Sequence, residues 1–136
     1  MKRKKDKRSP LFWSSLVFTT NMIHAFLAGF PLYSLFFACL TITSLIHHAT
    51  YTIYSHILDK LAILSIVMYG GYLMWNKRDQ SRFLLTICII TFLLCILFYI
   101  YGYMTCRYCF DKKNCDNWHM LLHIVGSFGH HMVLLL

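Results

Sequence analysis

Five long stretches of mainly apolar residues alternate with short polar connections along this chain. A helix that crosses a lipid bilayer needs about 20 such residues in a row, and each stretch has roughly that length. We therefore predict an all-α fold, a bundle of about five transmembrane helices. The predicted spans are residues 11–29, 32–53, 57–75, 83–104 and 118–136. Residues 1–10 are expected to form a basic tail, and residues 11–136 a single transmembrane domain.

The connections between the stretches agree with this division. Gly29-Phe30-Pro31 predicts a tight turn after the first span, because proline cannot continue the hydrogen bonding of the preceding helix. Residues 76–82 and 105–117 are polar loops. The first span follows basic residues, as the core of a signal peptide does, but it is long, contains Asn21 and His24, and lacks a small-residue cleavage site. We interpret it as a retained span.

Composition and charge exclude an ordinary soluble domain and suggest an orientation. The chain is 58% hydrophobic and contains no glutamate. Ten of its 13 lysines and arginines fall on the side of the N-terminus, which places that end in the cytosol of a multi-pass protein, for example in an endomembrane of the ER or Golgi. The basic tail could bind nucleic acid, but beside a first span it is more typical of an orientation signal and a contact with anionic lipids. We expect no nucleic acid partner.

One acidic residue, Asp59, lies in a predicted span, whereas the other four lie in polar tails or loops. An ionisable side chain among lipid-facing helices is costly and marks a candidate functional site. Ser44 and His48 are four residues apart near the end of the second span, and His119 and His123 are four apart at the start of the last. With five spans, all five residues lie on the same side of the membrane.

This set of residues suits a metal-dependent hydrolase. Three neutral histidines, His48, His119 and His123, match the ligands of a catalytic zinc ion, whose fourth position stays open for water. Zinc lowers the pKa of such a water to about 7. Asp59 could take up its proton as a general base and return it to the leaving group, and Ser44 could hydrogen-bond the developing oxyanion or a ligand. The predicted reaction is hydrolysis of an amide or ester bond presented by a lipid.

Each of these residues also has a simpler interpretation. A histidine in a transmembrane helix often only bridges helices by hydrogen bonding. Asp59 could be the ion-pair partner of Lys60 at the membrane interface, and a transmembrane serine such as Ser44 commonly bonds the backbone of its own helix. Five residues that share both the helical spacing and the side of the membrane favour the metal site.

Neighbouring polar and small residues are left out of the predicted site. His47 points about 100° away from His48 on the helix, and His56 falls in the short loop between the second and third spans. Gly126 and Gly129 are expected to allow close contact between helices.

Three cysteines in the last loop raise a separate question. Cys106, Cys109 and Cys115 could bind a second zinc ion, form a disulfide or remain free thiols. Free thiols are favoured because the predicted cytosolic side is reducing and a fourth ligand is not obvious.

Three stretches carry a resemblance to a known family. Residues 44–48 (SLIHH), 57–64 (ILDKLAIL) and 118–124 (WHMLLHI) resemble the alkaline ceramidases. These belong to the CREST superfamily of membrane hydrolases, with the progestin and adipoQ receptors and the hydrolases that remodel GPI-anchor lipids. The resemblance implies the pattern S-x3-H, an aspartate and a final H-x3-H. By it, His48, His119 and His123 would bind zinc, Asp59 would act on the attacking water, and Ser44 would complete the site.

The chain also departs from that family. Members usually have seven helices and about twice this length, so two helices are missing, and a second copy of the chain could supply them. The acidic N-terminal segment that ceramidases use for calcium is replaced by Met1-Lys2-Arg3-Lys4-Lys5, and the acidic residue that often follows the aspartate is Lys60 here. The resemblance therefore implies the chemistry more than the substrate, which would be a sphingolipid or another acyl lipid.

Two other classes of protein fit part of the pattern. A receptor-like membrane protein could keep zinc as a structural element without turnover. A bis-histidine haem protein could hold iron between one of His47 and His48 and one of His119 and His123. The haem interpretation gives no role to Asp59 or Ser44.

Overall fold

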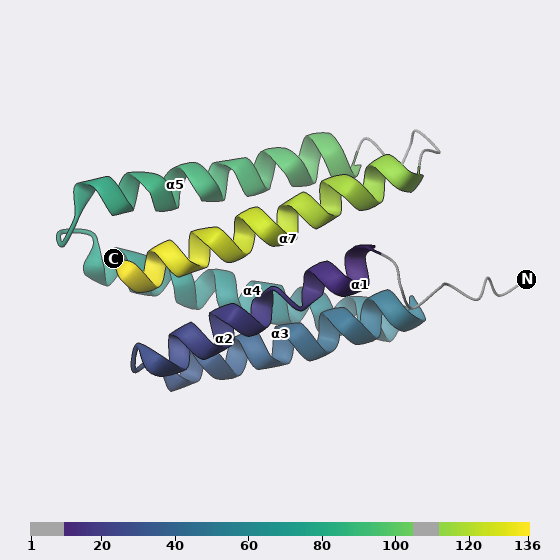
Figure 1. The fold of residues 1–136 in the computed structure, drawn as a ribbon, viewed down its shortest axis with the longest axis horizontal. Helices are drawn as coiled ribbons and strands as arrows, with labels where there is room; N and C mark the ends of the chain where they lie inside the picture. Colours follow the sequence, from purple (N-terminus) through teal and green to yellow (C-terminus); the bar gives the residue numbers. More distant parts are fainter. Residues whose placement is uncertain (1–9, 105–111) are drawn as a thin grey trace, which may run out of the picture. The chain divides into compact units, whose positions relative to one another are not determined.

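The computed structural model describes residues 10–104 and 112–136, and this part of the chain is all-α (Figure 1). Its elements form five helical segments, as predicted: the first is divided into two short helices, and the fourth continues into a π-helical stretch. In chain order they are α1 (Pro10–Ser15), α2 (Phe18–Leu27), α3 (Pro31–Thr50), α4 (Ile53–Lys77), α5 (Arg82–Leu97), η1 (Phe98–Met104) and α7 (Lys112–Leu135).

Three helices within the described ranges are long and apolar enough to cross a membrane. They are α3, α4 and the run from Arg82 to Gly102 that joins α5 to η1. The first segment falls short because α1 and α2 have only 6 and 10 residues. The last segment, α7, is long but its apolar run is interrupted by four histidines, His119, His123, His130 and His131. That these two segments also cross the membrane stays a prediction.

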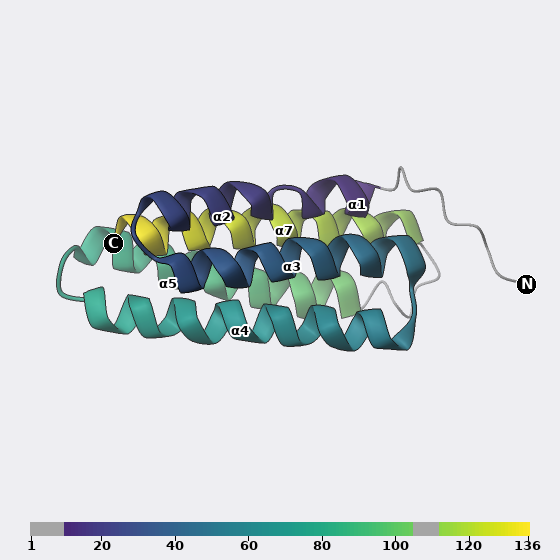
Figure 2. The same cartoon turned by 90° about the horizontal axis from the view of Figure 1, so that it is seen from below.

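The chain divides into two compact units, Met1–Met68 and Tyr69–Leu136. In the first unit α1 and α2 pack against α3 (Figure 2), around buried Ala25, Tyr33 and Phe37. In the second unit α7 packs along α5 and η1. This division does not test whether residues 11–136 form a single domain, which stays a prediction.

A break between α1 and α2 interrupts the predicted first span. The hydroxyl groups of Ser14 and Ser15 both donate to the carbonyl oxygen of Leu11, at 3.1 and 2.8 Å. The backbone N–H groups of Leu16 and Val17 then bond to carbonyls only three residues back. Serine hydroxyls that bond to carbonyls three or four residues earlier tend to bend a helix. The double serine therefore accounts for two short helices in place of one.

The turn from α2 to α3 is the one predicted from the sequence. Gly29 has φ 82°, a left-handed conformation that favours glycine. Pro31 is the first residue of α3, where its missing N–H costs no hydrogen bond.

The turn from α3 to α4 is shorter than predicted, and it moves His56 from a loop into a helix. α3 ends at Thr50 and α4 begins at Ile53, four residues before the expected start. The backbone N–H of Ser55 donates to Thr52 Oγ1, and that of Thr52 donates to Ser55 Oγ, both at 3.2 Å. This reciprocal cap satisfies donors that a helix start leaves open. Because of this cap, α4 begins before the apolar stretch from which its start was predicted.

Gly129 allows close packing in the second unit, as expected. A Cβ at Gly129 would lie 2.7 Å from Thr91 Oγ1, whereas one at Gly126 would lie 3.8 Å from Cys95 Sγ, an ordinary van der Waals distance. At Gly102, in η1, an added Cβ would lie 2.5 Å from the ring of Trp118 on α7. The side chain of Trp118 therefore occupies the space that the absence of a Cβ at Gly102 provides.

We expect Gly102→Ala to destabilise the protein by about 1–3 kcal/mol, the usual cost of overpacking, because the new methyl group overlaps the indole of Trp118. The matched control is Gly71→Ala, since a Cβ at Gly71 meets nothing within 4 Å and alanine favours a helix. Thermal unfolding of both variants in detergent measures the difference. Equal melting temperatures for the two would contradict the packing described.

Candidate metal centre

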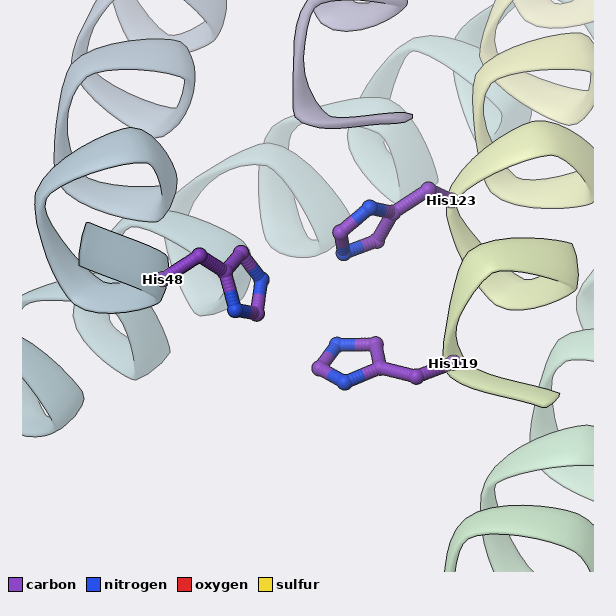
Figure 3. A group of neighbouring side chains, drawn as sticks. All are labelled: His48, His119 and His123. Carbon is purple, nitrogen blue, oxygen red and sulfur yellow. The ribbon is translucent and has the colours of Figure 1, made fainter. Parts of the chain in front are cut away.

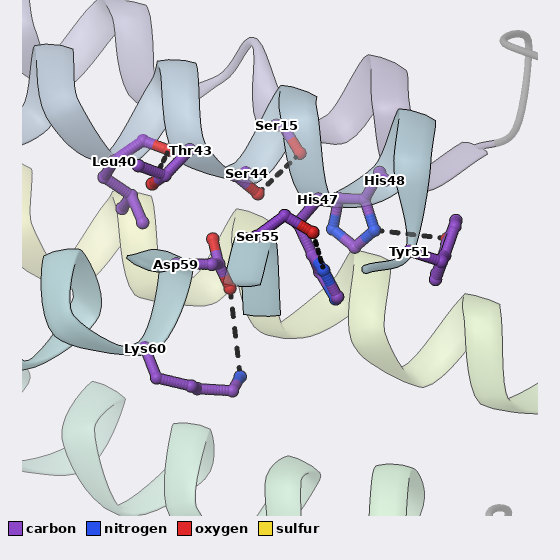
Figure 4. Close-up of polar contacts among 10 residues, drawn as sticks. All are labelled: Ser15, Leu40, Thr43, Ser44, His47, His48, Tyr51, Ser55, Asp59 and Lys60. Carbon is purple, nitrogen blue, oxygen red and sulfur yellow. Dashed lines mark hydrogen bonds and ion pairs between the residues drawn. The ribbon is translucent and has the colours of Figure 1, made fainter. Parts of the chain in front are cut away.

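His48 lies in the last turn of α3 and is 2% exposed. Its Nδ1 is 3.3 Å from the hydroxyl oxygen of Tyr51 (Figure 4). Tyr51 adopts a left-handed backbone conformation, with φ 53° and ψ 38°, where α3 ends. This turn brings the tyrosine ring back to the histidine. One nitrogen of His48 is thus fixed by a neighbour, and the other, Nε2, is also buried.

Ser44 lies one turn before His48 on α3 and is 1% exposed. Its Oγ is 3.0 Å from Oγ of Ser15, which comes from α1 and is fully buried. Sequence reasoning missed Ser15. A serine in an apolar run carries no signal of its own, and its distance along the sequence from Ser44 does not reveal the contact, because the two residues belong to different helices.

Asp59 lies in the second turn of α4 and is 3% exposed. Its carboxyl group points toward Ser44 (Figure 4). Lys60 Nζ is 3.9 Å from Oδ2, and Oδ1 is buried without a hydrogen-bond partner among the described residues. The carboxylate is therefore only partly compensated by the groups around it.

His119 and His123 lie one turn apart on the same face of α7. Their ring centroids are 4.7 Å apart, and the planes of the rings meet at 71°. His123 is buried, while His119 as a whole residue is partly exposed. The i, i+4 spacing read from the sequence thus produces a pair of adjacent imidazoles.

His48, His119 and His123 form a buried cluster that could hold a metal ion. Each offers one ring nitrogen, and these three atoms all lie within 4.8 Å of one another. Figure 3 shows the three rings turned toward one another. The three predicted ligands are therefore brought together, and the identity of a metal and the roles of Asp59 and Ser44 stay predictions.

The histidines left out of the prediction do not join this cluster. His47 Nδ1 is 3.3 Å from Ser55 Oγ, and its ring lies 5.1 Å from that of His56. Both rings therefore contribute to the α3–α4 turn. Cys106 and Cys109 lie outside the described residues, as does the side chain of Cys115, so the alternatives for these cysteines stay open.

The fold and the site together define an all-α protein with three helices suited to crossing a membrane and a buried cluster of three histidines. No known protein family matches the chain, and no curated protein or solved structure gives a significant match.

We expect Lys60→Gln to change the free energy of unfolding by less than about 1 kcal/mol, because its contact with Asp59 is long and the lysine is partly exposed. Thermal unfolding in detergent measures this, with Asp79→Asn as a control in another long, exposed pair, Arg78 with Asp79. A loss of several kcal/mol at Lys60 alone would mean that Asp59 serves mainly as its ion-pair partner.

Proposed function

We propose that this protein is an integral-membrane, zinc-dependent hydrolase that cleaves an amide or ester bond of a lipid. The observation that carries the proposal is the buried cluster of His48, His119 and His123. The carboxylate of Asp59 and the hydroxyl of Ser44, both buried, add the groups that hydrolysis requires.

The donor set fits zinc. Nitrogen ligands of a tetrahedral zinc ion at about 2.0–2.1 Å lie about 3.3 Å from one another. The donors here lie within 4.8 Å of one another, which is near that spacing. A histidine that binds a metal usually donates its other ring N–H to a neighbour, and the contact of His48 Nδ1 with Tyr51 supplies that neighbour. Three protein ligands leave one position for a substrate or water.

Bound zinc would supply a Lewis acid that polarises a carbonyl group and makes water more acidic. Asp59 would hold the proton released by the attacking water and pass it to the leaving group. Its position suits this role, since the carboxyl group is buried and its ion-pair contact with Lys60 is long, at 3.9 Å. The hydroxyl of Ser44 would orient the carboxylate or donate to the developing oxyanion.

The surface of the helices that carry these groups supports a lipid substrate. Leu61, Leu64 and Met68 on α4 are each more than half exposed, and such an apolar face suits contact with acyl chains. The resemblance of residues 44–48, 57–64 and 118–124 to the ceramidases supports a sphingolipid or another acyl lipid. The excess of basic residues at the N-terminal side supports a cytosolic N-terminus.

The two rival classes of protein leave part of the site unexplained. A haem iron takes two axial ligands and would use neither the third histidine nor Asp59. A purely structural zinc ion usually has four protein ligands, whereas the cluster offers three among the described residues.

We expect purified wild-type protein to contain about one zinc ion per chain. His48→Ala, His119→Ala and His123→Ala should each lose it, because two ligands rarely retain zinc. Elemental mass spectrometry of detergent-purified protein measures the metal content.

Two variants serve as matched controls for zinc content. His47→Ala removes an imidazole beside His48 that is not in the cluster, and Ser44→Ala removes a hydroxyl group from the same helix face; both should keep the metal. A folded wild type without zinc, or equal zinc in all five variants, would rule out the proposed centre.

We expect Asp59→Asn to keep zinc but to lower the rate of lipid hydrolysis by about 100-fold or more, the usual loss when a general base is removed. Release of fatty acid from ceramides, acyl esters and GPI-like lipids in mixed micelles measures the rate. Unchanged hydrolysis in this variant would remove Asp59 from the mechanism, and zinc without hydrolysis in the wild type would favour the receptor-like class.

A further inference from the structure

We infer that Tyr51 is a positioning residue of the proposed zinc site, whose phenol group holds the ring of His48 in the orientation that binds the metal. The inference rests on the proposed function, since it assigns a further residue to the same site. Tyr51 lies just beyond the end of α3, outside the motifs from which the site was predicted.

The phenol group contacts one edge of a buried imidazole. Nδ1 of His48 is 3.3 Å from the hydroxyl oxygen of Tyr51, and the centroids of the two rings are 5.9 Å apart (Figure 4). His48 is 2% exposed, whereas Tyr51 is 41% exposed. Tyr51 therefore belongs to the boundary of the site, where it can orient a metal ligand without occupying the space between the three histidines.

The backbone of Tyr51 is left-handed, with φ 53° and ψ 38°. No other residue of the described chain except glycine has a positive φ. A bulky side chain in this region costs free energy, and such residues cluster where a functional site requires them. A helix end of this kind usually carries glycine or asparagine. Tyrosine is therefore present here at a cost to folding, and its contact with His48 gives that cost a function.

The tautomer of an imidazole decides which of its nitrogens can bind a metal. A neutral histidine has one N–H group and one nitrogen with a free lone pair, and a phenol oxygen can accept a hydrogen bond. When Nδ1–H of His48 donates to Tyr51, the lone pair lies on Nε2. Figure 3 shows a ring nitrogen of His48 turned toward His119 and His123. A partner of this kind fixes the ring of a metal ligand and increases its basicity.

The ring of Tyr51 also contacts a second histidine. Its centroid is 5.3 Å from that of His47, and His47 Nδ1 is 3.3 Å from Ser55 Oγ in the cap of α4. Phenylalanine at position 51 would keep these ring contacts and remove the hydroxyl group alone. The effect of Tyr51→Phe therefore isolates the hydrogen bond to His48.

The test measures the zinc affinity of the full chain in detergent, by competition with a chromogenic zinc chelator at constant neutral pH. Affinity is more sensitive than metal content, because a tight site stays filled after a moderate loss. We expect Tyr51→Phe to bind zinc about tenfold or more weakly, the usual loss when the partner of a metal ligand is removed. The matched control is Tyr54→Phe, which removes a phenol hydroxyl from a side chain that is 78% exposed and should leave the affinity unchanged.

A second variant separates the hydroxyl group from the backbone. Glycine adopts the left-handed conformation more readily than tyrosine, but it has no hydroxyl group. Tyr51→Gly should therefore lose at least as much zinc affinity as Tyr51→Phe. Equal affinities in Tyr51→Phe and Tyr54→Phe, or wild-type affinity in Tyr51→Gly, would overturn the inference.

Thermal unfolding of the zinc-free variants distinguishes positioning from support of the fold. A bond that only supports the fold would lower the melting temperature of zinc-free Tyr51→Phe below that of Tyr54→Phe and leave the zinc affinity unchanged, which would also overturn the inference. The proposed function can fail separately. Zinc binding without lipid hydrolysis in the wild type would remove the hydrolase, while the affinities of the variants would still decide the role of Tyr51. A wild type that binds no zinc would overturn both.

Discussion

The structure depends on one constraint: polar side chains that are buried among apolar helices need other protein groups as partners in place of water. Taking a hydroxyl, an imidazole or a carboxylate out of water is costly unless hydrogen bonds or charges replace the lost solvent. Ser15 contacts Ser44, His48 contacts Tyr51, and Lys60 lies 3.9 Å from Asp59. The first of these contacts joins two helices, and the second fixes a turn. Two of the groups proposed to carry out chemistry, Ser44 and His48, therefore also hold α1 against α3 and fix the end of α3.

The fold was predictable where the signal is local. The length of each apolar stretch indicated the helical segments, and the chemistry of Gly29 and Pro31 fixed the turn between α2 and α3. Two features escaped because a hydropathy pattern does not contain them. The break after Ser15 comes from side-chain bonds to Leu11, and the early start of α4 comes from a reciprocal cap in which serine stands where glutamate or glutamine is usual.

The same distinction applies to the candidate site, where local spacing was predictive and contacts between distant residues were not. Repeated spacing of four residues on α7 predicted the adjacent rings of His119 and His123, and the three predicted ligands do lie together. Tyr51 and Ser15 were missed because their importance lies in contacts that sequence spacing cannot show. Tyr51 reaches His48 only through a left-handed residue at the end of α3, a conformation that an aromatic side chain rarely adopts.

The length of α4 has a consequence for where in a bilayer this chemistry would occur. Its 25 residues extend about 37 Å at 1.5 Å per residue, which exceeds a hydrocarbon layer of about 30 Å. Asp59 comes six residues after the first residue of α4, about 9 Å along its axis. A spanning α4 would hold this carboxylate near the boundary between acyl chains and headgroups, far from the midplane. A lipid could then present its linkage to the site from one leaflet, with its acyl chains still among their neighbours.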